Sequence, residues 1–320
     1  MSGRAPSTPD PARASTSPGE HPAERSGNDL WHDFVRTPTA LLAAAVALLC
    51  LAGALLAPWL APHDPSDLAR LDLADSHLPP AWMGDGRASY PLGTDDQGRD
   101  MLSALLYGLR ISLMVGLSSV ALSAVIGVTA GLIAGFVGGI VDAALMRLSD
   151  VMLSFPTILI ALLIDGVGRA AFPHAHEALA FAVLIVALTL GEWVRYARTV
   201  RGSTLVERHK EYVQAARLAG VPPGRLLRRH VLPNVLGPVL VLATIQVGQA
   251  IVAEATLSFL GVGVPPTTPS LGTLMRIGND FLFAGEWWIT LFPAVALVLV
   301  SMSVNLLGDW LRDALNPRLR

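Results

Sequence analysis

Long apolar runs without a charged residue alternate with shorter polar segments along this chain. Three of these runs contain no Asp, Glu, Lys or Arg: Thr37–His63, Ile111–Val141 and Trp287–Gly308. Each is longer than the roughly 20 residues that an α-helix needs to cross a bilayer. A fourth run, His230–Ala253, also lacks these four residue types, although polar residues and a proline stand near its start. The pattern predicts an all-α integral membrane protein.

Two shorter apolar stretches between these runs leave alternatives open. If Val151–Ile164 and Ala178–Gly191 each cross the bilayer, each must include charged residues at its ends. The alternative is that the two stretches form one re-entrant pair. We favour two full spans, because Arg147 and Asp150 are three residues apart and can pair on one helix face. Pro156 is expected to kink the third span. The six expected transmembrane helices are Thr39–Leu60, Ile111–Phe136, Val151–Ile164, Ala178–Gly191, Pro233–Leu260 and Trp287–Leu307.

The composition agrees with a membrane protein surrounded by lipid. Hydrophobic residues make up 52% of the chain and charged residues only 15%, against about 25% charged residues in soluble domains. The net charge of −2 provides no field that would attract nucleic acid. The single cysteine, Cys50, has no partner for an internal disulfide and is expected to pack as a small apolar residue.

Basic residues are divided unevenly between the two sides that six spans define. Of the 23 Lys and Arg residues, 17 fall on the side that holds both termini and residues 202–232, and 6 fall on the other side. Cytoplasmic loops of membrane proteins carry the excess of Lys and Arg. Both termini are therefore expected in the cytoplasm.

These spans divide the chain into five parts. Residues 1–37, rich in Pro, Ser, Ala and Gly, predict a disordered cytoplasmic tail, and 38–60 form the first transmembrane helix. Residues 61–108 form an extracytoplasmic segment with an amphipathic helix, which Thr94 and Gln97 at capping-box spacing are expected to start. That helix runs into a five-helix core, 109–313, and 314–320 form a cytoplasmic C-terminus.

The chain contains one lysine, Lys210, which follows Arg208-His209 and not a glycine-rich loop. A phosphate-binding GxxxxGK[ST] loop is therefore excluded. If the protein takes part in ATP-driven work, another polypeptide binds the ATP and its Mg²⁺. We predict no catalytic residue and no cofactor of its own.

The segment His174–Glu177 reads HAHE and suggests a metal site. The spacing of its histidines does not support that interpretation. A zinc-binding HExxH helix would need histidine where Ala180 stands. We favour a solvated loop over a metal site, and a membrane-embedded metalloprotease is not supported. The sequence also lacks a GxSxG nucleophile motif.

Two features inside the predicted spans have a structural and a functional interpretation. Gly127, Gly131 and Gly135 recur every four residues and favour close packing of another helix, with a flexible gating role as the alternative. Glu254 lies late in the fifth span, where burial of a charge is costly. It is either hydrogen-bonded within the bundle or part of a transport path.

Residues 202–232, the polar hairpin, interrupt the apolar pattern in the second half of the chain. Thr204 and Glu207 have capping-box spacing and predict the start of a helix. Gly220 within AGVPPG predicts its end and a turn, and a second short helix is expected before Pro233.

One face of the first hairpin helix carries only small side chains, including Ala215 and Ala216, between flanking charges. Such a face suits insertion into a groove on a partner protein. The alternative is a surface helix lying on lipid headgroups, which also favour arginine.

The polar hairpin resembles the cytoplasmic EAA loop of ABC-importer permease subunits. That pattern is E-A-A, three residues, G, nine residues, then a hydrophobic residue followed by proline. Gln214-Ala215-Ala216, Gly220 and Leu232-Pro233 stand at these spacings. Gln214 departs from the glutamate that is usual there, and Glu211, one turn earlier, is a substitute for its charge.

Other segments resemble the C-type permease of dipeptide and oligopeptide (peptide/nickel) importers. They include YPLGTDDQGRDMLSALLYGLRISL, AEATLSFLGVGVPPTTPSLG and NLLGDWLRDALNPRLR, and the likeness covers roughly 30–320. The resemblance implies a type I ABC-importer permease fold in the bacterial inner membrane. It further implies three kinds of partner: a second homologous permease, two ATP-binding subunits that dock on the polar hairpin, and an extracytoplasmic substrate-binding protein.

Peptides are the substrates that this resemblance favours, with nickel or another small solute as the alternative. An ATP-independent secondary transporter is a more distant hypothesis.

Overall fold

The computed structural model describes residues 27–65, 67, 71–171, 176–265 and 267–315, and the chain divides into two units, Met1–Thr37 and Pro38–Arg320. In the first unit the described part is one helix, α1 (Gly27–Arg36). The prediction of a disordered tail over 1–37 is wrong for these ten residues. Apolar residues recur at helical spacing in GNDLWHDFVR, and the Thr37 hydroxyl donates to the Asp33 carbonyl at 2.8 Å, which closes the last turn before Pro38.

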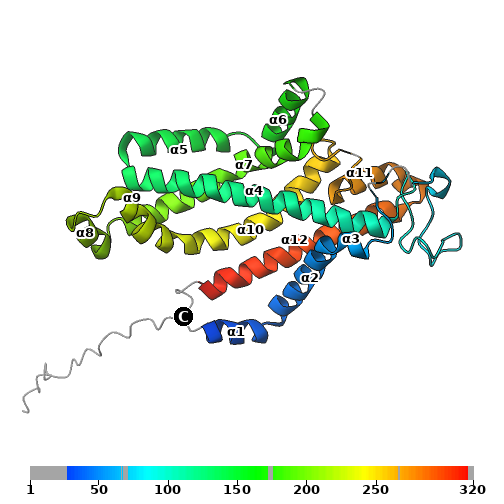
Figure 1. The fold of residues 1–320 in the computed structure, drawn as a ribbon, viewed down its shortest axis with the longest axis horizontal. Coiled ribbons are helices and arrows are strands. Elements are labelled where there is room, and N and C mark those ends of the chain that lie inside the picture. The colour runs from blue at the N-terminus through cyan, green and yellow to red at the C-terminus, as the bar shows by residue number, and fades with distance from the viewer. Residues whose placement is uncertain (1–26, 66, 68–70, 172–175, 266, 316–320) are drawn as a thin grey trace, which may run out of the picture. The chain divides into compact units, whose positions relative to one another are not determined.

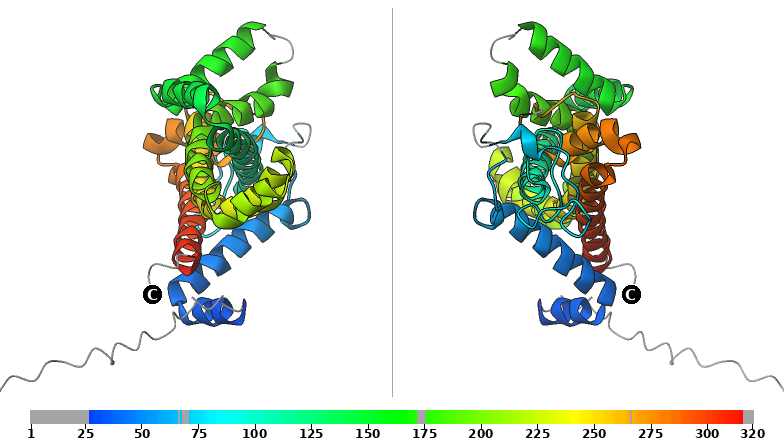
Figure 2. Two further views of the ribbon diagram at one scale, coloured as in Figure 1. Left: turned by 90° about the vertical axis from the view of Figure 1, so that its left-hand side faces the viewer. Right: turned by 90° about the vertical axis from the view of Figure 1, so that its right-hand side faces the viewer.

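The regular secondary structure of the second unit is helical wherever the structure describes it, apart from one isolated bridge between Thr94 and Asp100, and loops and turns join the helices (Figures 1 and 2). Its α-helices, with one stretch of π-helix and two of 3₁₀-helix, are α2 (Pro38–Leu55), α3 (Ala57–Leu60), η3 (Leu73–Asp75), α4 (Met101–Val137), α5 (Gly139–Leu153), α6 (Thr157–Ala171), α7 (His176–Glu207), α8 (Glu211–Leu218), α9 (Pro223–Leu226), η4 (Leu227–Val231, π), α10 (Leu232–Phe259), α11 (Leu271–Phe281), η5 (Leu282–Ala284) and α12 (Trp287–Leu315).

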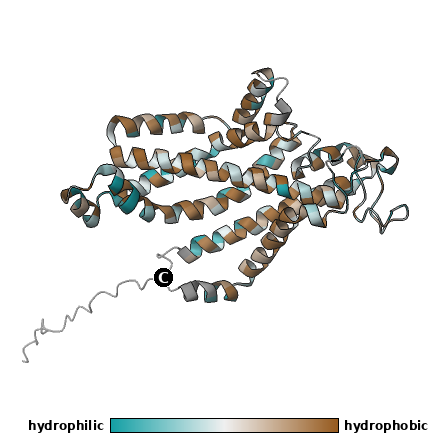
Figure 3. Ribbon diagram, viewed as in Figure 1, coloured by the Kyte–Doolittle hydropathy of each residue, from teal (hydrophilic) through white to brown (hydrophobic). Residues whose placement is uncertain are grey.

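Five helical segments of the described chain are long and apolar enough to cross a membrane. They are Pro38–Leu55, Met101–Val137, Leu179–Glu207, Pro223–Phe259 and Trp287–Ala314, and α5 with α6 forms a sixth candidate that is bent by 89°. Figure 3 shows apolar residues along these helices and a concentration of hydrophilic residues where α8 and α9 meet. The arrangement agrees with the predicted all-α membrane protein.

The third predicted span is not one straight helix. The chain leaves helical geometry between α5 and α6, where Pro156 supplies no backbone N–H donor and disfavours helical dihedrals in Phe155. The predicted kink is therefore a sharp break. The expected pairing of Arg147 with Asp150 is also replaced, because Asp150 accepts from Arg198 of α7 at 2.6 Å.

The most extensive helix contact in the described chain joins α4 and α7, which lie side by side in Figures 1 and 2. Gly127, Gly131 and Gly135 face α7 along this contact. A methyl group on Gly135 would come within 2.7 Å of the Thr204 Cβ, and one on Gly131 would overlap the Ala197 carbonyl oxygen. The absence of side chains at these three positions lets the two backbones approach closely.

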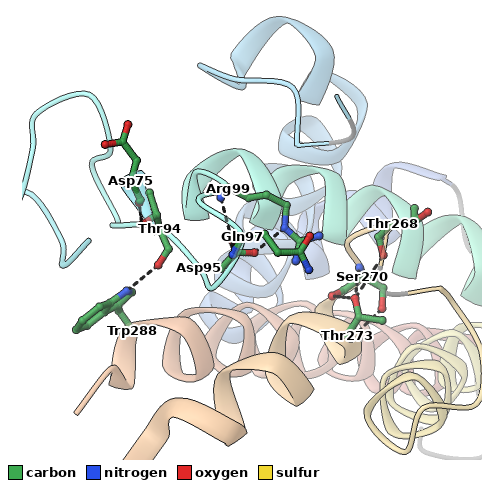
Figure 4. Close-up of polar contacts among 9 residues, drawn as sticks. All are labelled: Asp75, Thr94, Asp95, Gln97, Arg99, Thr268, Ser270, Thr273 and Trp288. Carbon is green, nitrogen blue, oxygen red and sulfur yellow. Dashed lines mark hydrogen bonds and ion pairs between the residues drawn. The ribbon is translucent and has the colours of Figure 1, made fainter. Parts of the chain in front are cut away.

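Buried polar side chains hold the start of α4, and the residue that caps this helix is not the predicted one. The N-cap is Asp100, whose carboxylate accepts from the Ser103 backbone at 2.9 Å, so the helix begins after the expected Thr94–Gln97 box. Thr94 instead accepts from Trp288 of α12 through its carbonyl oxygen at 3.1 Å (Figure 4).

A second buried contact, from Arg99 Nε to Asp95 Oδ2 at 2.6 Å, lies in the same loop, and both of its side chains are fully buried (Figure 4). Asp95 also accepts from two backbone amides, which compensates part of the cost of burying its charge. The loop therefore fixes the start of α4 against α12.

Replacing Gly131 with alanine is expected to lower the melting temperature of the detergent-solubilised protein, because the added methyl overlaps the α7 backbone. Overpacking of this kind costs about 1–3 kcal/mol. Gly202→Ala, on α7, is the matched control: its methyl meets nothing within 4 Å. The control should keep or raise the melting temperature, since alanine favours a helix over glycine by about 1 kcal/mol. Equal melting temperatures for the two variants would contradict the close-packing role.

Candidate functional site

The polar hairpin begins inside α7. Thr204 is buried against α4 and continues α7 to Glu207, so the predicted helix start at Thr204 is wrong. Packing against Gly135 extends this helix past the local capping signal. The first hairpin helix is α8, which begins at Glu211. The second short helix, α9, continues through η4 into α10 with no break, so the chain returns to the membrane as one helical segment.

The turn after α8 is held by hydrogen bonds that require glycine. The Val221 amide donates to the Ala216 carbonyl and the Gly220 amide to the Arg217 carbonyl, both at 3.1 Å. This pair of bonds is the Schellman motif, and it places Gly220 in the left-handed region at φ +77°. Val221 and Ala216 both pack on the same apolar core, which completes the motif.

The two faces of α8 differ sharply in burial. Val213 is fully buried in a core cluster shared with α7 and α10, and Ala216 packs on that cluster. On the other face Ala215 is exposed and Leu218 is 91% exposed. A large apolar side chain at such exposure, beside a small one, forms a surface that water solvates poorly.

Three side chains tie α8 to the helices on either side. The Tyr212 hydroxyl donates to the Glu207 carboxylate at the end of α7. It also accepts from the Asn234 amide of α10 at 2.9 Å. Burial, together with the hydrogen bond to Glu207, raises the pKa of Tyr212 to about 12. The hydroxyl therefore stays protonated at physiological pH and keeps its donor role.

A second set of contacts joins the polar hairpin to the end of α4. Arg208 Nη1 donates to the Gly135 carbonyl at 2.8 Å, one of the last carbonyls of α4 that lack a helical partner. The Arg217 guanidinium lies 5.8 Å from the centre of the Phe136 ring, a cation–π arrangement. A cavity of about 460 Å³ lies between these elements, lined by Phe136, Val137, Arg208, His209, Gln214, Arg217 and Leu218.

Gln214 has a local partner that glutamate could not use in the same way. Its amide Nε2 donates to the His209 carbonyl at 3.0 Å across the turn between α7 and α8. A carboxylate at this position has no donor for that carbonyl. Glu211 stands in the first turn of α8, where a negative charge is favourable beside the helix N-terminus.

The remaining predicted residues fall at other places. Leu232 packs on the core beside Val213, and Pro233 is exposed at the start of α10. Glu254, toward the far end of α10, is fully buried and accepts from Ser258 Oγ at 2.7 Å. Part of His174–Glu177 lies outside the described residues, and those that are described include no group of His, Cys, Asp and Glu that could hold a metal ion.

Sequence reasoning missed Tyr212 and Asn234, and it assigned Glu207 to a capping box and not to its bond with Tyr212. They are 5 and 22 residues apart along the chain, so no helical spacing joins all three. The available signal was their polarity at the ends of two apolar helices.

Comparison with known proteins gives two family matches. Residues 127–320 match the family described as binding-protein-dependent transport system inner membrane component. Residues 27–80 match the N-terminal TM domain of oligopeptide transport permease C.

Two curated relatives align with most of the chain. The di/tripeptide transport system permease protein DppC of Pseudomonas aeruginosa (strain UCBPP-PA14) is 39% identical over 292 residues, which are 91% of this chain and 92% of that protein. The dipeptide transport system permease protein DppC of Escherichia coli (strain K12) is 40% identical over 292 residues, 91% of this chain and 93% of that protein.

A solved structure of the MetNI methionine ABC transporter, in an inward-facing conformation, shares the fold. The TM-score is 0.54 at 22% identity, with 68% of this chain and 98% of that chain covered. The predicted ABC-importer permease fold is confirmed.

Replacing Gly220 with alanine is expected to loosen α8, because a left-handed backbone costs an L-residue about 1–2 kcal/mol. Hydrogen exchange of amides 213–221 should quicken by about tenfold, the factor that 1.4 kcal/mol corresponds to. Gly224→Ala is the control, because Gly224 is not in the left-handed region and has open space around it. Unchanged exchange in Gly220→Ala would show that α8 does not depend on this turn.

Proposed function

The chain belongs to the family of binding-protein-dependent transport system inner membrane components, and we propose that it is the permease subunit of an ATP-binding-cassette importer for peptides. The observation that supports the mechanism is the exposed face of α8. This face holds Leu218 at 91% exposure on a helix anchored to both α7 and α10. The peptide cargo is proposed from the names of the relatives, which are dipeptide and di/tripeptide permeases.

In this proposal the work is divided among several polypeptides. The chain and a second homologous permease form the path across the inner membrane. Two ATP-binding subunits dock on the polar hairpin and carry the nucleotide and Mg²⁺, in keeping with the single lysine of this chain. An extracytoplasmic binding protein delivers the peptide. The chain itself catalyses no reaction.

The exposed face of α8 suits a groove on the ATP-binding subunit. Leu218 provides an apolar anchor, and the neighbouring Ala215 lets the groove wall approach the helix backbone. Movement of the docked subunit is passed through Tyr212 to the end of α7 and the start of α10.

Replacing Leu218 with glutamate tests the docking role. The side chain is almost fully exposed, so the fold should be retained, whereas a charge in an apolar groove should weaken binding of the ATP-binding subunits by tenfold or more. Co-purification of these subunits and ATP-dependent dipeptide uptake are the measurements. Phe283→Glu, at a position 97% exposed beyond α11, is the matched control for binding. Undiminished subunit binding and uptake in Leu218→Glu would refute the docking assignment.

The orientation is tested by labelling single cysteines from one side. Cys50 is buried and is replaced by serine, after which His209→Cys or Phe283→Cys provides the label site. With a cytoplasmic hairpin, a membrane-impermeant maleimide should modify residue 283 in intact spheroplasts and residue 209 only after permeabilisation. The reverse pattern would place the polar hairpin and both termini outside.

A further inference from the structure

A group of four polar side chains lies halfway along α7 and α10. This mid-helix cluster consists of Glu192, Arg195, Gln246 and Gln249. Arg195 Nη1 donates to Gln246 Oε1 at 2.9 Å and to Gln249 Oε1, and Arg195 Nε lies 3.3 Å from Glu192 Oε2. Gln246 Nε2 donates to the same Glu192 oxygen at 2.5 Å. The two glutamines and the ion pair thus form one continuous network.

The cluster lies well inside the two candidate membrane-spanning segments Leu179–Glu207 and Pro223–Phe259, so α7 extends the expected fourth span, Ala178–Gly191, beyond Gly191. Glu192 is 16 residues from the first residue of α7 and 15 from the last. Gln246 is 14 residues from the start of α10 and 13 from its end. At 1.5 Å of rise per residue, about 20 Å of helix separates the cluster from either end. A charge at this depth is costly unless it faces protein or water.

The exposed fraction of the side chains rises from Gln246 through Glu192 to Arg195. Gln246 is 2% exposed and the Glu192 side chain 19%, but the Arg195 side chain is 47% exposed. Gln249 is exposed beside it. The side chains of Gln246 and Glu192 therefore hold one edge of the Arg195 guanidinium. The exposed edge keeps positively charged N–H donors. Hydrocarbon would exclude such a surface, so this side of α7 and α10 faces a watery passage or another protein.

Building on the proposed function, we propose that Arg195 binds the terminal carboxylate of a peptide in transit and that the mid-helix cluster forms part of the wall of the path. Nη1 donates to both glutamines and Nε faces Glu192, so Nη2 is the nitrogen that the network leaves for a carboxylate, which it binds through charge-assisted hydrogen bonds. Every linear peptide with a free C-terminus carries this group whatever its side chains are, so one site serves many sequences. Glu192 and Gln246 act as positioning residues, because they fix the guanidinium before the peptide arrives.

The test uses the full complex of this chain, the second permease, two ATP-binding subunits and the binding protein in proteoliposomes that enclose ATP. Uptake of radiolabelled dialanine is measured for Arg195→Gln, Arg195→Lys and Arg198→Gln. Arg198 is the matched control, since its side chain is also 47% exposed but pairs with Asp150 on the α5 side. Binding-protein-stimulated ATP hydrolysis and recovery of the second permease are measured on the same preparations.

Arg195→Gln is expected to lower uptake by about tenfold or more, because the charge-assisted hydrogen bonding to the carboxylate is lost. Arg195→Lys should retain an intermediate rate, and Arg198→Gln should stay within about twofold of the wild type. ATP hydrolysis by Arg195→Gln should stay within about twofold of the wild type too, since the polar hairpin is unaltered. A merely structural Arg195 would lower uptake and ATP hydrolysis together.

Besides a joint loss of uptake and ATP hydrolysis, two outcomes would overturn the inference while leaving the proposed function in place. The first is wild-type uptake by Arg195→Gln. The second is loss of the second permease from the Arg195→Gln complex, which would make the cluster a contact between subunits. A wild-type complex without ATP-dependent dialanine uptake would refute the proposed function and this inference with it.

A photoreactive benzoylphenylalanine in place of Gln249 provides a readout that does not depend on the rate. During turnover it should attach radiolabelled dialanine to this chain. The same group in place of Leu49, which is 73% exposed on α2, should not. Equal labelling at both positions would contradict a site in the path.

Discussion

The cost of placing charge in a bilayer governs how the helices surround α7. This one spanning helix carries Glu192, Arg195, Arg198 and Arg201, and each has a polar partner. Two of the partners, Asp142 and Asp150, belong to α5, and Gln246 belongs to α10. An unpartnered charge in hydrocarbon is strongly disfavoured, so α5 and α10 must lie against α7. The glycine face of α4 covers another side of the same helix. The core is therefore assembled around α7 by pairing as well as by apolar packing.

The same arrangement connects the polar hairpin to the membrane interior. Tyr212 joins α8 to Glu207 and Asn234, which lie at the membrane ends of α7 and α10. These two helices also carry the mid-helix cluster. Between α9 and α10 the chain forms a π-helical stretch, Leu227–Val231, and such stretches interrupt the regular hydrogen-bond ladder. A push on α8 thus acts directly on the two helices that line the proposed site, and the π-helical stretch gives α10 a place to adjust.

Sequence patterns predicted the features that depend on local chemistry. Runs without charge located the spans, Gly220 marked the end of α8, and glycines four residues apart located the close helix contact. Capping-box spacing failed at Thr94 and at Thr204, where contacts with distant segments decide the conformation. Arg198 pairs with a residue 48 positions away, and Gln246 with one 54 positions away. Such pairs depend on which helices become neighbours, and helical periodicity carries no information about that choice.

Burial separates the two ionisable residues that could take part in transport. Glu254 was equally compatible with a structural and a transport role from its sequence position. Its side chain has no exposed surface and is bonded to Ser258 within its own helix, beside the capped start of α11. A cargo molecule can reach it only if α10 and α11 separate. Arg195 stands on the same helix bundle with almost half of its side chain open, and a buried network already holds its orientation. Direct contact with cargo therefore falls to Arg195, and Glu254 contributes to the packing that keeps α10 in place.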